Sequence, residues 1–216
     1  MLCCPDIFSQ LKVHRGFNGV FSDGLYDTVL SYIRPLLERT NSANELYYNN
    51  TIHIGGHSLG GANAQVFGTY YAYFHPDVKT YVTTLGSPRQ GNYAYKVLGE
   101  SLSNLSVWRM VHCRDVVPRV PNFNYYHAGH LMWKRCNPPS GDKISNDVVE
   151  AYYRHDGDFE QEFAETPRSF AVRSLEPTMI TDHFGPAYLE WLEYGRNYGK
   201  NWTSFFEPML NGTVVA

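Results

Sequence analysis

A serine flanked by glycines at residues 56–60 has the spacing of a hydrolase nucleophile. The segment reads Gly56-His57-Ser58-Leu59-Gly60; it follows the β-branched run "TIHI" and precedes a helical pattern. Because a Gly-x-Ser-x-Gly pattern also occurs by chance, the prediction depends on the strand–turn–helix context. A sharp turn there exposes the hydroxyl, and side chains at positions 56 and 60 would clash with neighbouring backbone. We therefore predict that Ser58 is a nucleophile, with Gly56, His57 and Gly60 completing its turn.

The backbone amide of Leu59 is expected at the first turn of the following helix. N–H groups at a helix N-terminus carry partial positive charge and point toward bound anions. We predict that the Leu59 N–H stabilises the oxyanion that forms when a serine attacks a carbonyl.

A serine hydroxyl is weak without a base, and in sheets of this type the acid and then the histidine follow the serine in the chain. Asp115 comes just after an expected strand and is the predicted acid, with Asp182 as its rival. His183 lies in a loop directly before the last expected helix and is the predicted base, with His155 as the alternative. No cofactor and no metal is expected, since no cluster of ligand residues has convincing spacing.

Strands and helices alternate along the chain. The spacing of apolar residues predicts strands at 12–17, 51–56, 79–86 and 106–112, and helices at 22–39, 62–71, 93–103 and 185–195. The apolar stripe of the first helix comprises Leu25, Val29, Leu30, Ile33, Leu36 and Leu37. Asn92 is expected to cap the helix at 93–103, and the inner side of the last helix is expected to carry Tyr188, Leu189 and Leu192. Residues 137–180 are polar and weakly periodic, and we expect a long excursion there with one strand. Alternation of this kind predicts an α/β fold with a mainly parallel sheet and helices on both faces. We expect a single domain over residues 1–216.

Composition excludes several classes of protein. The 216 residues carry a net charge of −3 and no run of basic residues, so nucleic acid is not an expected partner. The apolar stretches are too short for a transmembrane segment. The first residues do not have the pattern of a signal peptide, yet there are four Asn-x-Ser/Thr sequons, at Asn49, Asn104, Asn201 and Asn211. We expect a secreted or secretory-pathway protein if the true N-terminus carries a signal peptide.

The four cysteines are Cys3, Cys4, Cys113 and Cys136. A disulfide between Cys113 and Cys136 would close a loop and stabilise the fold in an oxidising compartment. The alternative is a buried free thiol at Cys113. Both interpretations stay open at this stage.

Five ordered segments resemble the class 3 lipase family, the fungal-type triacylglycerol lipases. These are "KVHRGF", "GGHSLGGA", "TLGSPRQGN", "RDVVPRVP" and "YYHAGHLMW", which run over residues 12–133, and the loop and helix at 181–195 follow. The resemblance implies an α/β-hydrolase fold and a serine carboxylic-ester hydrolase of lipid metabolism. It places Ser58, Asp115 and His183 on the family's triad positions.

The resemblance also has departures. The family has an earlier strand, which supplies a second oxyanion donor, and a lid after it; here only eleven residues precede "KVHRGF", so the first strands and lid are expected to be missing. The family's His-x-x-Tyr is replaced by "HFGPAY". The expected substrates are acylglycerols or small esters. We expect the protein to make transient contact with a lipid interface when it binds them. The sequence indicates no oligomeric state. Two alternatives remain: an esterase or phospholipase acting on another acyl ester, and a truncated, non-catalytic protein that binds lipid or a partner.

Overall fold

The structure is a computed structural model that describes residues 9–38, 43, 50–121, 123–134, 149–152 and 177–197. The chain divides into two compact units. The first comprises Met1–Met110 and Val117–His130, and the second comprises Val111–Val116 and Leu131–Ala216. The single domain expected over residues 1–216 stays a prediction.

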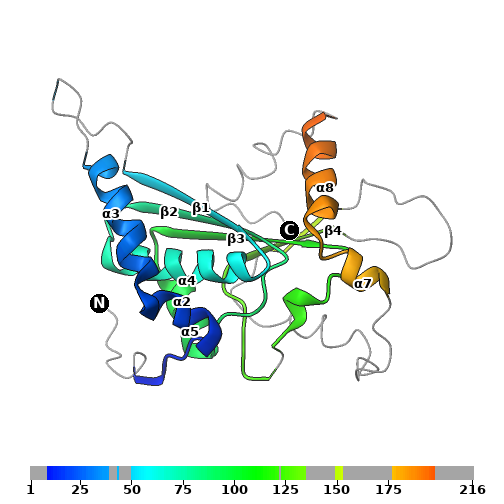
Figure 1. The fold of residues 1–216 in the computed structure, drawn as a ribbon, viewed down its shortest axis with the longest axis horizontal. Coiled ribbons are helices and arrows are strands. Elements are labelled where there is room, and N and C mark those ends of the chain that lie inside the picture. Colours follow the sequence, from blue (N-terminus) through cyan, green and yellow to red (C-terminus); the bar gives the residue numbers. More distant parts are fainter. Residues whose placement is uncertain are drawn as a thin grey trace. The chain divides into compact units, whose positions relative to one another are not determined.

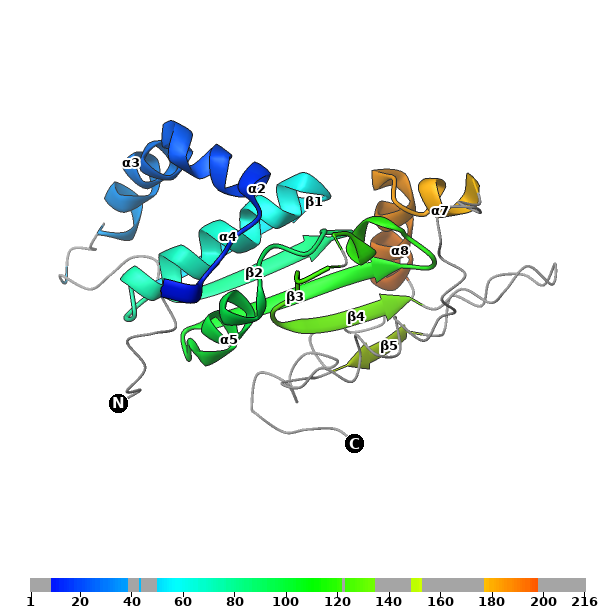
Figure 2. The ribbon, with the colours of Figure 1, turned by 90° about the horizontal axis from the view of Figure 1, so that it is seen from below.

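The first unit is built on three parallel strands in the order β1-β2-β3, seen side by side in Figure 2. β1 is Thr51–His57, β2 is Lys79–Leu85 and β3 is Leu105–His112. The register places Ile54 opposite Val82 and Val82 opposite Val107. These apolar side chains pack with Ala64 into one core cluster. The predicted parallel α/β sheet is confirmed, with strand ends within about one residue of those expected.

Helix α4, Leu59–Phe74, lies along this sheet (Figure 1). Gly68 permits the close approach, because a Cβ at that position would collide with the Val82 side chain of β2. Helix α5, Tyr93–Ser101, packs beside α4, and the Oδ1 of Asn92 caps it by accepting the Tyr95 N–H at 3.2 Å. Both predicted helices and the predicted Asn92 cap are confirmed.

The predicted helix at 22–39 is observed as α3, Tyr26–Leu37, preceded by a π-helical segment η1, Phe21–Leu25. A break occurs at Gly24, whose φ of 88° lies in the left-handed region that glycine tolerates. Four residues of the predicted apolar stripe pack against the buried cluster formed by Phe67 and Tyr71 of α4 and by Val78: Val29, Leu30, Ile33 and Leu37. Leu25 and Leu36 are 40% and 50% exposed, so the stripe is narrower than expected.

The predicted strand at 12–17 is wrong. Within this range only Val13 makes a β-type pairing, an isolated bridge to Gly91. Helix α2 begins at Arg15 and ends at Val20. The helix starts here because the carbonyl of His14 accepts the N–H groups of Phe17 and Asn18, both at 3.0 Å. The Nδ1 of His14 also accepts the Gly16 N–H at 3.2 Å. Local bonds to one histidine therefore override the β-like composition of the segment.

The second unit contains the last residues of β3 and two further strands. β4 is His130–Lys134, and its first residue, His130, still belongs to the first unit. β5 is Val149–Tyr152 and runs antiparallel to β4. Helices α7, Pro177–Thr181, and α8, Gly185–Asn197, follow. β5 is the one strand expected in the excursion, most of which lies outside the described residues. α8 confirms the last predicted helix. Tyr188 is buried, as predicted, and Trp191 is buried as well, whereas Leu189, which was also expected on the inner side, is 57% exposed.

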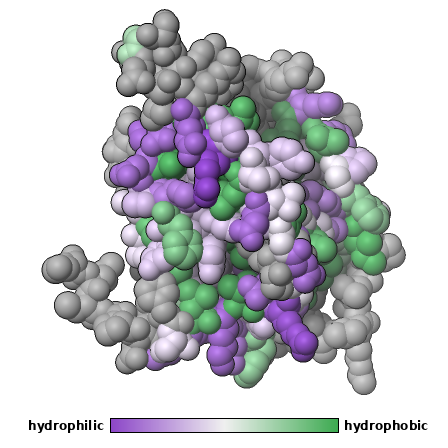
Figure 3. Space-filling model, turned by 60° about the vertical axis from the view of Figure 1, so that its left-hand side comes forward, coloured by the Kyte–Doolittle hydropathy of each residue, from purple (hydrophilic) through white to green (hydrophobic). Residues whose placement is uncertain are grey.

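No helix among the described residues is long and apolar enough to cross a bilayer. On the face drawn in Figure 3, apolar residues in green lie interspersed with polar residues in purple. The exposed large apolar side chains include three aromatic residues of α4: Tyr70, Tyr73 and Phe74.

Candidate active site

Ser58 occupies a strained position between β1 and α4. Its φ of 56° and ψ of −127° place a non-glycine residue at positive φ, which costs free energy and is concentrated at functional sites. The Ser58 N–H donates to the carbonyl of Leu85 at 2.9 Å, and its carbonyl accepts the Ala62 N–H at 3.2 Å. The turn is thus tied both to strand β2 and to the first turn of α4.

Of the two glycines that flank Ser58, Gly56 is required for the predicted steric reason and Gly60 is not. A Cβ at Gly56 would collide with the carbonyl of Gly60, so a side chain is excluded there as predicted. A Cβ at Gly60 would meet nothing within 4 Å, so the predicted steric reason for Gly60 is wrong. The tight position is Gly61, where a Cβ would lie 3.0 Å from both the Gly56 oxygen and the Ser87 Cβ. Gly60 contributes its backbone, while Gly61 keeps α4 close to the sheet.

Leu59 is the first residue of α4, and its side chain is 52% exposed. Its backbone amide therefore belongs to the positive end of a 16-residue helix, directly after Ser58. The position of this amide agrees with the sequence prediction, whereas its role toward an oxyanion stays a prediction.

In the second unit the structure pairs His183 with Asp115. The His183 Nδ1 lies 3.0 Å from Oδ1 and 2.9 Å from Oδ2 of a carboxylate that is fully buried. Because a carboxylate only accepts hydrogen bonds, Nδ1 carries the proton, which leaves the lone pair on Nε2. The His183 N–H donates to the carbonyl of Ile180 at 3.1 Å, which anchors the loop between α7 and α8.

The rival acid Asp182 has other partners. Its Oδ2 accepts the backbone N–H of Arg114 at 3.1 Å, and its Oδ1 lies 3.6 Å from the Nδ1 of His112. Burial raises the pKa of the Asp182 carboxyl above its usual value. Asp115, not Asp182, therefore contacts the predicted base. The alternative base His155 lies outside the described residues.

Tyr188 is a buried partner of Asp115 that sequence reasoning assigned only to the inner side of a helix. Its hydroxyl donates to Asp115 Oδ2 at 2.7 Å and accepts the backbone N–H of His112 at 3.0 Å. Burial, and then the nearby Asp115 charge, raise the pKa of Tyr188 well above its usual value, so the hydroxyl keeps its proton. The available signal was the tyrosine that follows the histidine in the family pattern, five residues after His183 here rather than three.

The turn that carries Asp115 is held on several sides. Cys113 has a φ of 44° and is disulfide-bonded; the predicted partner Cys136 lies outside the described residues, so that pairing stays a prediction. The Cys113 N–H donates to the Lys134 carbonyl at 2.9 Å, and the Trp133 indole N–H donates to the Cys113 carbonyl at 2.8 Å. These bonds join the turn to β4.

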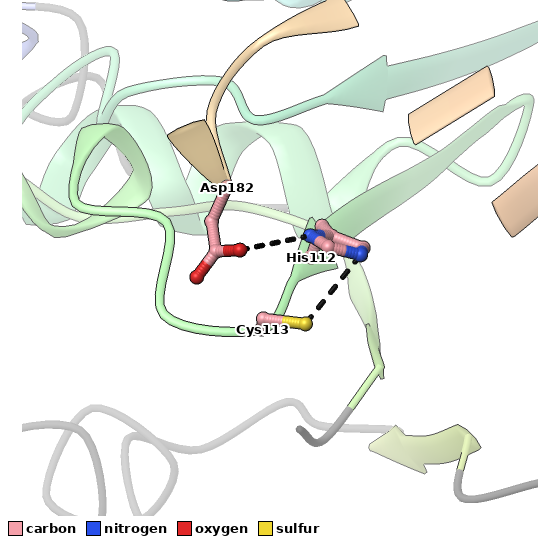
Figure 4. Close-up of side chains that lie close together, drawn as sticks. All are labelled: His112, Cys113 and Asp182. Atoms are coloured by element: carbon pink, nitrogen blue, oxygen red, sulfur yellow. Dashed lines mark hydrogen bonds and ion pairs between the residues drawn. The ribbon is translucent and has the colours of Figure 1, made fainter. Parts of the chain in front are cut away.

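One group of three side chains with metal-ligand chemistry occurs among the described residues: His112, Cys113 and Asp182, drawn in Figure 4. Asp182 lies near the Nδ1 of His112, whereas the Cys113 sulfur lies 3.4 Å from the Nε2. One ion cannot bind both nitrogens of a ring, and a disulfide-bonded sulfur offers no thiolate. The group does not fit a metal site. Burial, and then Lys134, lower the pKa of His112 to about 4, so this ring is neutral at neutral pH.

Of the four sequons, only Asn104 lies among the described residues, and its side chain is engaged. Its Nδ2 donates to three carbonyls, those of Ala72 at 2.9 Å, His75 at 3.1 Å and Val78 at 3.0 Å. A glycan would replace one of the two hydrogens on this nitrogen and would have to fit among the three carbonyls, so the folded environment of Asn104 does not fit glycosylation.

A parallel sheet with a serine at the turn between β1 and α4 belongs to the α/β-hydrolase class of folds. The model of the family "Lipase (class 3)" matches residues 3–125, more than half of the chain. The chain belongs to the class 3 lipase family, as the sequence motifs predicted.

The most similar proteins include fungal lipases. The chain is 32% identical over 127 residues to a lipase of Rhizopus niveus, a match that covers 56% of this chain and 30% of the relative. It is 29% identical over 147 residues to "Secreted mono- and diacylglycerol lipase 1" of Fusarium solani, covering 66% of this chain and 40% of that protein. The matched part thus spans about a third of the length of such curated relatives.

The solved structure of lipase II from Rhizopus niveus has the same fold. It superimposes with a TM-score of 0.59 at 25% identity, over 83% of this chain and 60% of the lipase. The predicted α/β-hydrolase fold is thereby confirmed.

Proposed function

We propose that the protein is a serine carboxylic-ester hydrolase in which Ser58, His183 and Asp115 act together. The observation that carries the proposal is the bond between the His183 Nδ1 and the buried carboxylate of Asp115, in a chain of the class 3 lipase family. The strained backbone at Ser58 and the position of Leu59 at the start of α4 support it.

The reaction has two halves. The Ser58 Oγ forms a bond to the ester carbonyl carbon while its proton passes to His183 Nε2, and Asp115 stabilises the resulting imidazolium through Nδ1. The carbonyl oxygen becomes an oxyanion, which accepts a hydrogen bond from the Leu59 N–H. The C–O bond to the alcohol then breaks, and His183 returns the proton to the leaving alcohol. Water repeats the sequence on the acyl-enzyme, releasing the carboxylic acid and restoring Ser58.

The proposed substrates are acylglycerols. The support is the family and the names of the relatives, one of which is a mono- and diacylglycerol lipase described as secreted. The same relative and the disulfide at Cys113 favour an extracellular or secretory location, because disulfides persist in oxidising compartments. Transient contact with a lipid interface belongs to this proposal.

The test is labelling of the purified, folded protein with a fluorophosphonate, which forms a covalent bond only with activated serines. We expect labelling of the wild-type chain and none of Ser58→Ala. His183→Ala should reduce labelling by more than about 10³-fold, since the hydroxyl then lacks its base. Circular dichroism of each variant checks the fold.

Assays on monoacylglycerol, triacylglycerol, a phospholipid and a p-nitrophenyl ester then assign the substrate class. Preference for the phospholipid or the aryl ester would replace the acylglycerol assignment. The absence of labelling in a folded sample would refute catalysis by this chain. The alternative function would then be binding of lipid or of a partner.

A further inference from the structure

A cavity of about 820 Å³ lies in the first unit, against the second half of α4. Its size is within the range of about 300–1,000 Å³ that is common for small-molecule sites. The segment before α2, helices α2, α3 and α5, and Tyr125 supply the remaining walls. All the lining residues belong to the first unit.

The wall that α4 provides is a stripe of apolar and aromatic side chains. Tyr70 lies four residues after Val66, and Tyr73 and Phe74 lie three and four residues after Tyr70, so these side chains share one side of the helix. The three aromatic residues are 52%, 40% and 55% exposed. Apolar surface of this kind, gathered in a hollow, favours binding of an apolar ligand.

The floor of the cavity is ordered. Tyr95 is 2% exposed, and its hydroxyl is hydrogen-bonded to Thr69 Oγ1 at 3.1 Å and to the carbonyl of Gln65 at 3.3 Å. Its ring therefore presents a fixed apolar surface, with the polar end of the side chain already satisfied.

Charges on the cavity lining favour an anion. Lys12 and Arg15 contribute two positive charges and Asp27 one negative charge, which leaves one net positive charge for the ligand. The backbone of Lys12 is held in place, because its N–H donates to Asn92 Oδ1 at 3.0 Å and its carbonyl accepts the Asn92 N–H at 2.9 Å. The ligand that matches this lining has a long apolar chain and a single negative charge.

We propose that this cavity is a binding site for a long-chain carboxylate, separate from Ser58. The acyl chain lies along the aromatic stripe of α4, and the carboxylate pairs with Lys12 and Arg15. Ser58 precedes the first residue of α4, and the first lining residue of that helix is Val66, roughly 12 Å further along its axis. The ligand belongs to the same chemical class as the acid released under the proposed function, although binding here does not depend on hydrolysis.

Binding is measured on Ser58→Ala protein, so that no reaction interferes. Oleate, kept below its micellar concentration, displaces a fluorescent long-chain polyene acid, and oleyl alcohol serves as the uncharged analogue. We expect oleate to bind at least tenfold more tightly than oleyl alcohol. The double variant Lys12→Ala/Arg15→Ala should lose this preference. The double variant Tyr73→Ala/Phe74→Ala should lower the affinity for oleate and for oleyl alcohol alike. Lys79→Ala and Tyr93→Ala, at exposed positions away from the cavity, are the matched controls.

Three results would overturn the site. They are no oleate binding to folded protein, oleate affinity unchanged in the Lys12/Arg15 variant, and loss of oleate binding when wild-type Ser58 carries a small diethylphosphoryl group. The last result would mean that the acyl chain occupies the reacting site itself. Failure of catalysis is read separately, from fluorophosphonate labelling of wild-type protein, so the two proposals can fail independently.

Discussion

The hydroxyl of Tyr188 donates a 2.7 Å hydrogen bond to the carboxylate of Asp115, and the same hydroxyl accepts the backbone N–H of His112. One buried side chain from α8 therefore holds both the acid and the end of the strand that leads to it. Because Asp115 is also bonded to His183, the orientation of the proposed base depends on this tyrosine.

Tyr188→Phe should lower kcat for a soluble ester by about 10- to 100-fold, because a hydrogen bond to a charged group contributes about 1.5–3 kcal/mol. The fold should also lose about 1–3 kcal/mol, since the His112 N–H is left buried without its acceptor. Ester kinetics and urea unfolding measure the two effects. Tyr93→Phe, 61% exposed, is the matched control. An unchanged kcat would show that Tyr188 does not position Asp115.

Asp115→Asn should reduce kcat by about 10⁴-fold, the effect expected when an amide replaces a carboxylate that holds a catalytic imidazole. Asp182→Asn should change kcat less than about tenfold, because Asp182 contacts Arg114 and His112 and not His183. The two variants are compared in one ester assay with fold checked by circular dichroism. The reverse order of effects would make Asp182 the acid.

Gly56→Ala and Gly60→Ala should have opposite effects on the free energy of unfolding. The Gly56 Cβ would collide with the Gly60 carbonyl, so this variant should lose several kcal/mol of stability or fail to fold. At Gly60 the Cβ meets nothing within 4 Å, and alanine favours the helix by up to about 1 kcal/mol. Thermal unfolding of both variants measures the two changes in stability. Equal destabilisation would contradict the observed geometry of the turn.

Asn104 should carry no glycan when the protein is expressed through a secretory pathway, because its Nδ2 is used in three hydrogen bonds. Peptide mass spectrometry measures this, with the other sequon peptides as internal controls. Asn104→Ala should lower stability by about 1–3 kcal/mol, since buried acceptors lose their donor. A fully occupied glycan at Asn104 in folded protein would contradict this structure.

His112 should make folding stability fall as the pH is lowered from 6.5 to about 4. Burial and Lys134 hold its folded pKa at about 4, below the unfolded value near 6.5, so the unfolded chain binds more protons in this window. The stabilising effect is complete above pH 6.5 and is lost as the pH falls through about 4. Urea unfolding at several pH values should give a smaller slope for His112→Gln than for the wild type. Equal slopes would mean that His112 titrates normally in the folded protein.

Local patterns predicted much of the fold. The strands β1, β2 and β3 and the helices α4, α5 and α8 were foreseen because each has a clear period and a turn residue or cap at its end. Ser58 could be selected as the candidate nucleophile for the same reason, since its motif lies within one strand–turn–helix segment. The strand expected at 12–17 failed because bonds to His14, which composition does not show, start a helix there.

What the sequence by itself determined is the family, the parallel α/β sheet and the candidate residues, because these depend on short motifs and on apolar periodicity. Tertiary structure alone decided which aspartate contacts His183, that Tyr188 supports Asp115, that Gly61 and not Gly60 is sterically constrained, and that the Asn104 side chain is occupied. Each of these depends on groups that lie far apart in the chain or on a backbone path through a turn. Hydrogen bonds and close contacts between such groups leave no periodic trace in the order of the residues.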